Sequence, residues 1–169
     1  MKRYIIYFKY VVRHKWFVFL ACRKTGVSLW QAIIHDASKF SPLEFITYAK
    51  NFYNPDGSNR KDAYDLMKES LDYKYAWNHH EKNNKHHFGY WVVSSNDDGK
   101  PEVLPMPIKY IREMVADWAG AGKAINGHGN PYKWYADHGK KFLLHKDTRE
   151  YLEIYLNQLN VCAIFYEWF

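Results

Sequence analysis

The chain has 169 residues, which is enough for one ordinary domain with a core of its own. Hydrophobic residues make up 47% and aromatic residues 19%, a globular composition that excludes a disordered chain. The formal net charge of +6 favours an anionic partner, such as a nucleotide, a nucleic acid or a lipid surface. Charged residues interrupt the apolar N-terminal stretch, so we expect no signal peptide, no membrane span and no membrane partner.

The two cysteines, Cys22 and Cys162, are far apart and lie in apolar surroundings. Their spacing favours neither a disulfide framework nor a cysteine-type zinc site. We therefore expect a reducing, cytoplasmic setting.

Taken in chain order, the predicted elements are mostly helices with clear start signals. Ser28 with Gln31 and Ser41 with Glu44 have the spacing of capping boxes, in which each side chain satisfies the other's backbone N–H. Helices are expected at 3–24, 28–40, 41–53, 60–80 and 107–125, with a segment around 131–144 and a last helix over 147–168. A small β-hairpin is expected in the irregular segment 81–106. The prediction is an all-α protein, a single domain over 1–169 with five to seven helices.

Two of these helices show an apolar stripe that should face the core. On the first helix it comprises Tyr4, Tyr7, Phe8, Val11, Val12, Phe19 and Leu20. On the last helix it comprises Tyr151, Ile154, Tyr155, Leu159 and Cys162.

His35-Asp36 follows an apolar run on the second predicted helix, so both side chains should be buried. A buried carboxylate is costly unless it is paired or binds a metal ion, and imidazole with carboxylate is a suitable ligand pair for a divalent metal. Lys39 stands four residues after His35, on the same helix face, where its charge could neutralise a phosphate. The alternative is a surface ion pair between Asp36 and Lys39.

Asp117 lies on a predicted helix between apolar neighbours, a position that aspartate does not favour unless it has a specific role. Either it binds a metal ion, or it faces outward or pairs with Arg112 or Lys123. His14, taken alone, is typical of a surface histidine.

The segment 79–87 is the most unusual of the chain, with four histidines in nine residues: His79, His80, His86 and His87. Neutral imidazole is the commonest metal ligand in proteins. The alternatives are a solvated polar turn and a structural zinc clip.

The order of His14, His35-Asp36, a histidine group and Asp117 resembles the HD-domain metal-dependent phosphohydrolase superfamily, over roughly residues 10–125. The run from His35 to Phe40 is similar to its His-Asp-x-Gly-Lys signature, with Ser38 in place of glycine. The histidine pair at 79–80 is similar to that of HD-GYP phosphodiesterases, although the Gly-Tyr-Pro is missing. The chain is most similar to an uncharacterised family of short bacterial and phage proteins.

This resemblance implies an HD-like helical fold with one or two divalent ions (Mn, Co, Ni, Zn, Mg or Fe). The implied core ligands are His14, His35, Asp36 and Asp117. His80 and His86 are expected to bind a second metal or a phosphate. His79 and His87 are nearly equivalent candidates, expected with Lys39 to contact the substrate.

The implied activity is hydrolysis of a phosphate ester or anhydride in a nucleotide or another small phosphorylated molecule. One alternative is an HD-type di-iron oxygenase. The other is a nucleic-acid-binding module with a structural metal, which is less favoured because Lys and Arg are spread along the chain.

Overall fold

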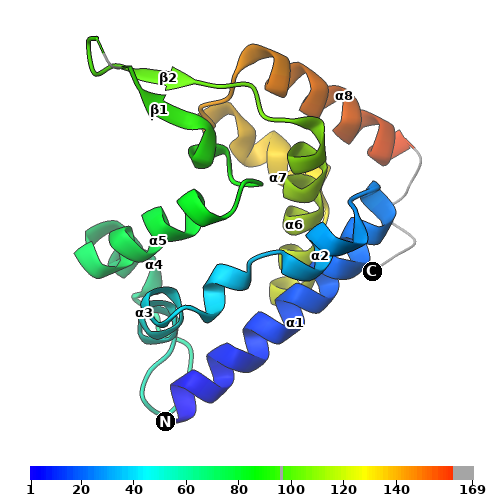
Figure 1. Cartoon of the computed structure of the whole chain (residues 1–169). Helices are drawn as coiled ribbons and strands as arrows, with labels where there is room; N and C mark the ends of the chain where they lie inside the picture. Colours follow the sequence, from blue (N-terminus) through cyan, green and yellow to red (C-terminus); the bar gives the residue numbers. More distant parts are fainter. Residues whose placement is uncertain (96, 162–169) are drawn as a thin grey trace. The chain divides into compact units, whose positions relative to one another are not determined.

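The structure is a computed structural model that describes residues 1–95 and 97–161, and in this part of the chain it is mainly helical (Figure 1). The α-helices are α1 (Lys2–Thr25), α2 (Leu29–Ile34), α3 (Pro42–Phe52), α4 (Ala63–Glu69), α5 (Leu71–Asn83), α6 (Ile108–Asn126), α7 (Pro131–His138) and α8 (Lys146–Val161). Three short 3-10 helices are η1 (Ala37–Phe40), η2 (Phe88–Trp91) and η3 (Gly139–Lys141). The all-α class is confirmed.

The expected hairpin is present as two short antiparallel strands, β1 (Val92–Ser94) and β2 (Pro101–Val103). They lie side by side in Figure 1, with Val92 opposite Val103. The segment expected as one helix at 60–80 is two helices, because Ser70 ends α4 and caps α5 through a bond from the Tyr73 backbone N–H at 3.2 Å.

The second helix ends at Ile34, so its predicted extension to Phe40 is wrong. His35 leaves the helical conformation with ψ 128°, and Asp36 follows in the left-handed region at φ 52°. The pair therefore does not lie on a buried helix. It forms a sharp bend between α2 and η1, in a conformation that Asp tolerates better than most residues.

Only half of each predicted capping box is present. The hydroxyls of Ser28 and Ser41 accept bonds from the backbone N–H of Gln31 and Glu44, at 3.3 and 3.4 Å. The Gln31 and Glu44 side chains do not bond back to their caps. They reach the carboxylate of Glu113 and two histidine rings, respectively.

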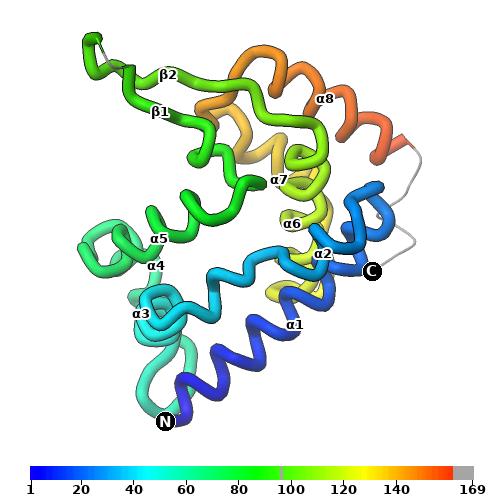
Figure 2. The backbone as a smooth tube through the Cα atoms, viewed as in Figure 1, coloured from blue at the N-terminus to red at the C-terminus, as the bar shows by residue number. Residues whose placement is uncertain are grey.

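By its internal contacts the chain divides into two compact units. Unit 1 comprises residues 1–13 and 36–84, and unit 2 comprises 14–35 and the chain from 85 onward. α1 runs without interruption as one helix, so its first half belongs to unit 1 and its second half to unit 2 (Figure 2). The single-domain assignment stays a prediction.

The core of unit 1 is aromatic and joins α1, α3 and α5. Its buried residues are Tyr7, Val11, Tyr48, Ala49, Tyr73 and Ala76. The Tyr48 hydroxyl donates to the Ala76 carbonyl at 3.1 Å, which satisfies the polar end of a buried ring.

Unit 2 has two core clusters that share α6. One packs α6 against α8 through Met106, Ile111, Met114, Val115, Leu152, Tyr155, Leu156 and Leu159. The other packs α6 against the second half of α1 and α2 through Val18, Ala21, Cys22, Val27, Ala32, Ala116 and Ala119. Small residues dominate the second cluster, so the backbones of α1 and α6 approach closely.

Burial corrects both predicted stripes. Tyr7 and Val11 are buried, whereas Phe8 and Val12 are about half exposed. On α8, Ile154 is exposed. Its place on the packed face is taken by Leu152 and Leu156, while Cys162 lies outside the described residues. In the described part of the chain no helix combines the length and the apolar character that crossing a bilayer requires.

Candidate metal centre

His14 lies on the buried side of α1 and is 2% exposed. It falls three residues after Val11 and four before Val18, both of which are fully buried. This spacing puts the imidazole on the apolar face of the helix, so the interpretation as a surface histidine is wrong.

The imidazoles of His14 and His35 converge on one carboxylate of α6. Their Nε2 atoms each lie 3.3 Å from Oδ1 of Asp117. Both rings are buried, and the Asp117 side chain is only 14% exposed. Asp117 thus points into the interior of unit 2, and the prediction that it could face outward is wrong.

The spacing of these three donors fits a divalent metal ion. Two ligand atoms at about 2.0–2.1 Å from a tetrahedral zinc ion lie about 3.3 Å apart. A charge-assisted N–H···O bond is shorter, at about 2.7–2.9 Å. Imidazole nitrogen and carboxylate oxygen are also the donors that Zn, Mn, Fe and Ni accept. The residues present therefore fit the group that the sequence predicted.

Glu113 lies one helical turn before Asp117 and holds the other side of His35. Its Oε1 is 2.9 Å from Nδ1 of His35 and 3.4 Å from Nδ1 of His86. Its Oε2 accepts a bond from Gln31, whose amide also donates to the Lys109 carbonyl. Burial raises the pKa of Glu113, but the bonds from His35 and His86 outweigh it and bring the pKa down to about 2.

Glu113 was not predicted as a site residue, although the sequence holds a signal for it. Residues four apart on a helix share a face, and Glu113 precedes Asp117 by four. Glu113 therefore lies on the same face of the helix as Asp117, and a buried carboxylate there needs a partner just as Asp117 does.

His86 is also part of this cluster, and it is 2% exposed. Its ring centroid lies 4.4 Å from that of His35, and its Nε2 lies 3.9 Å from Oδ2 of Asp117. His35, His86 and Glu113 each offer a ligand atom within 4.8 Å of the others. The interpretation of His86 as part of a solvated turn is wrong. His87 is half-buried, with its ring 4.4 Å from that of His86.

Asp36 and Lys39 belong to unit 1 and form an ion pair, Oδ2 to Nζ, of 2.6 Å. The pair is not a surface contact, because Asp36 is fully buried and the Lys39 side chain is 15% exposed. The argument that Lys39 shares a helix face with His35 is wrong, because the helix ends before both residues. Oδ1 of Asp36 lies 3.5 Å from Nε2 of His80.

Glu44 is the second buried carboxylate that the sequence did not reveal. Its two oxygens bind Nδ1 of His79 at 2.7 Å and Nδ1 of His80 at 2.8 Å. Burial raises the pKa of Glu44, and the bond and charge of His80, with the bonds from His79 and Ser38, lower it further than burial raises it. His80 is 2% exposed, so the solvated-turn interpretation is wrong for it too.

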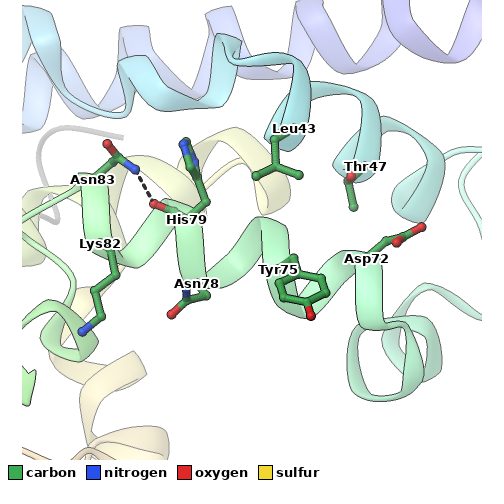
Figure 3. A pocket seen from close by; sticks show the side chains of 8 residues that line it. All are labelled: Leu43, Thr47, Asp72, Tyr75, Asn78, His79, Lys82 and Asn83. Carbon is green, nitrogen blue, oxygen red and sulfur yellow. Dashed lines mark hydrogen bonds between the residues drawn. The ribbon is translucent and has the colours of Figure 1, made fainter. Parts of the chain in front are cut away.

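His79 is partly exposed and lies at a cavity of about 510 Å³ between α3 and α5. In Figure 3, Leu43 and Thr47 face this space from α3, and His79 and Tyr75 project from α5. Asn83 donates to the His79 carbonyl at 2.8 Å, which closes the last turn of α5.

Each compact unit brings together several of the predicted site residues. Unit 2 brings together His14, His35, His86 and Asp117, with His87 beside His86. Unit 1 brings together Asp36, Lys39, His79 and His80 around Glu44.

The chain belongs to the family DUF5662, described as a family of unknown function, whose model matches residues 4–158. No curated protein and no solved structure gives a significant match to the chain.

Proposed function

We propose that this protein is a metal-dependent hydrolase of a phosphate ester or anhydride, acting on a nucleotide or another small phosphorylated molecule. The observation that supports it best is the convergence of two buried imidazoles on Oδ1 of Asp117, each at 3.3 Å. A divalent ion bound there would lower the pKa of a water molecule and polarise a phosphoryl oxygen. We further propose a cytoplasmic setting, as the cysteine spacing predicts.

The chain's own residues prepare this centre. Glu113 accepts the Nδ1 proton of His35, which leaves Nε2 as the nitrogen that faces Asp117. Lys15 donates to the backbone carbonyls of Ile33 and His35, which fixes the end of α2 and hence the His35 ring. The cluster therefore has the preorganised donors that metal binding requires.

The remaining predicted residues keep their proposed roles. Asp36, His80 and His86 stay proposed ligands, and Lys39, His79 and His87 stay proposed contacts for the phosphate. Asp36, His80 and His86 are buried, which supports a functional role over a solvated turn, because a buried polar group is costly unless it is paired or binds a ligand.

An oxygenase that uses iron is the second candidate. His35, His86 and Glu113 form a set of two imidazoles and one carboxylate, the donor set of many non-haem iron oxygenases. Iron content, colour and oxygen uptake of the purified protein distinguish this candidate from a hydrolase.

The test begins with metal binding, then turns to activity. Purified protein is stripped with a chelator, reloaded with Mn, Co, Ni, Zn or Mg, and assayed on a panel of nucleotides and phosphate esters. We expect His35→Ala and Asp36→Ala to abolish hydrolysis, and His128→Ala, an exposed histidine, to retain it. Full activity in both the His35 and Asp36 variants would reject the hydrolase.

A further inference from the structure

The first 35 residues carry more than the whole net charge of the chain. They contain seven basic residues and no Asp or Glu, a formal charge of +7. Since the whole chain has +6, residues 36–169 sum to −1. The basic residues are spread along the sequence, but their acidic counterparts are absent from α1 and α2, and this asymmetry favours an anionic surface as partner.

α1 also shows an apolar strip on its exposed side. Ile5, Phe8, Val12 and Trp16 follow one another at spacings of three or four residues, so they line one face of the helix. Each is about half exposed, and Trp16 reaches 58%. The face of α1 that packs in the cores is a different one and carries Val11 and Val18, so this strip is not a core stripe.

Basic residues flank the strip. Lys9 and Arg13 each follow a strip residue by one position, which is about 100° around the helix. Both are exposed. An apolar strip with a basic strip beside it is typical of helices that bind at a lipid–water interface.

α2 extends the apolar surface within unit 2. Its Leu29, Trp30, Ile33 and Ile34 are exposed, and Trp30 reaches 70%. Only Ala32 of this helix is buried. Lys15 of α1 donates to the Ile33 carbonyl, so the end of α2 lies next to the second half of α1. We refer to the strip of α1, its flanking basic residues and the exposed residues of α2 as the basic–apolar face.

Three partners could cover such a face, and the residue types distinguish them. A single-stranded nucleic acid is bound by basic and aromatic side chains, but it gains little from exposed Ile and Val, which cannot stack on bases. A second copy of the chain in a symmetric dimer would bring together two surfaces drawn from segments that each carry +7, which repels. An anionic lipid surface accepts aliphatic, tryptophan and basic side chains together.

We propose that the basic–apolar face docks this protein on the surface of an anionic lipid bilayer. α1 would lie in the plane of the headgroups with its apolar strip in the acyl boundary. The sequence argument against a membrane partner rested on the absence of a span, and a surface-bound helix needs none. The proposal stands independently of the metal centre.

The test is co-sedimentation of the full chain with two kinds of vesicle, phosphatidylcholine alone and an equal mixture with phosphatidylglycerol. We expect binding to the mixed vesicles and its loss as salt is added, because screening weakens the attraction. Lys9→Gln with Arg13→Gln should lower the partition coefficient about fivefold for each charge. Trp16→Ser with Trp30→Ser should lower it roughly tenfold or more, because the aromatic contacts with the boundary are lost.

Two control variants remove the same number of exposed charges or exposed aromatic rings at positions outside the basic–apolar face. Lys74→Gln with Lys100→Gln removes two exposed charges, and Tyr64→Ser with Tyr75→Ser removes two exposed rings, all outside the basic–apolar face. Both control variants should bind like the native chain. Quenching of native tryptophan fluorescence by brominated lipid tests insertion without any substitution.

Any of four results would overturn the proposal. The first is that the chain binds neither kind of vesicle, and the second is that the control variants and the face variants bind equally well. The third is that the chain binds a nucleic acid at a salt concentration at which it no longer binds the mixed vesicles. The fourth is a dimer in solution that Trp16→Ser with Trp30→Ser dissociates, since the face would then be an interface between copies.

Discussion

Glu113 accepts a bond from Nδ1 of His35 at 2.9 Å, and this bond decides which nitrogen of the ring is available to a metal ion. A carboxylate that binds the far nitrogen of a ligating histidine fixes its tautomer and raises its basicity. Glu113 itself is held by Gln31, so its carboxylate has little freedom to turn. The orientation of the His35 ring toward Asp117 therefore depends on Glu113 and Gln31.

We therefore predict that Glu113→Ala weakens metal binding about 10- to 100-fold, the usual effect of losing such a partner. Glu113→Gln keeps an oxygen that can accept the Nδ1 proton, so it should lose much less. Metal titration by calorimetry measures both, with His128→Ala as the control. An equal loss in the two variants, with one metal equivalent missing, would instead make Glu113 a ligand.

The residues of the centre were only partly predictable. Asp117 could be singled out because an isolated carboxylate in an apolar helix is conspicuous in any sequence, and its side chain is indeed largely buried. Glu44 was hidden because its position after Ser41 already had an explanation as a helix cap. The backbone N–H of Glu44 does donate to the Ser41 hydroxyl, as a cap requires, but its carboxylate binds His79 and His80. A sequence cannot show that one residue does both.

At the scale of elements, helix starts were predicted better than helix ends. Starts are set locally by side chains that satisfy the first N–H groups, as at Ser28 and Ser41. The end of α2 has no glycine or proline to mark it. It is set by Lys15, which precedes His35 by twenty residues. The Lys15 ammonium donates to the backbone carbonyls of Ile33 and His35 at this end of the helix. A contact between residues so far apart in the sequence leaves no local sequence signal for the end of the helix.

The close approach of α1 and α6 in unit 2 depends on Gly120. An ideal Cβ at this position would lie 2.5 Å from the backbone N of Val18, where nothing flexible can move away. Gly120→Ala should gain about 1 kcal/mol from helix propensity. The clash with the α1 backbone should cost about 1–3 kcal/mol and exceed that gain. Urea unfolding should show a net loss of stability.

Gly127 provides the comparison for this substitution. It ends α6 at φ 80° with open space around it, and asparagine tolerates that conformation. Gly127→Asn should change the free energy of unfolding by less than about 1 kcal/mol. A Gly120→Ala variant more stable than the native chain would show that α1 and α6 can separate at little cost.

For the whole molecule, the helical class follows from composition and from the 3.6-residue period of the apolar positions. Such a period identifies which face of a helix is buried, but it does not identify what covers that face. The buried side of α1 shows this, because Val11 packs in one unit and Val18 in the other. The division into two compact units therefore could not be predicted from periodicity.

The stability of the whole chain should depend on acid through Glu113. In the folded protein its pKa is about 2, and in the unfolded chain it returns to its ordinary value near 4.5. A depressed pKa contributes stability that is complete above about pH 4.5 and is lost as the pH falls toward 2. Each pKa unit corresponds to about 1.4 kcal/mol, so the contribution is on the order of 3 kcal/mol.

This prediction is measured by urea unfolding between pH 2 and 6 with a chelator present, because metal release is itself pH-dependent. Glu113→Gln cannot titrate, so its free energy of unfolding should fall less steeply with acid than that of the native chain. The difference between the two should be largest above about pH 4.5 and should shrink as the pH approaches 2. Parallel profiles over this range would mean that the carboxylate does not stay ionised in the folded protein, and that His35 and His86 do not hold it as the structure indicates.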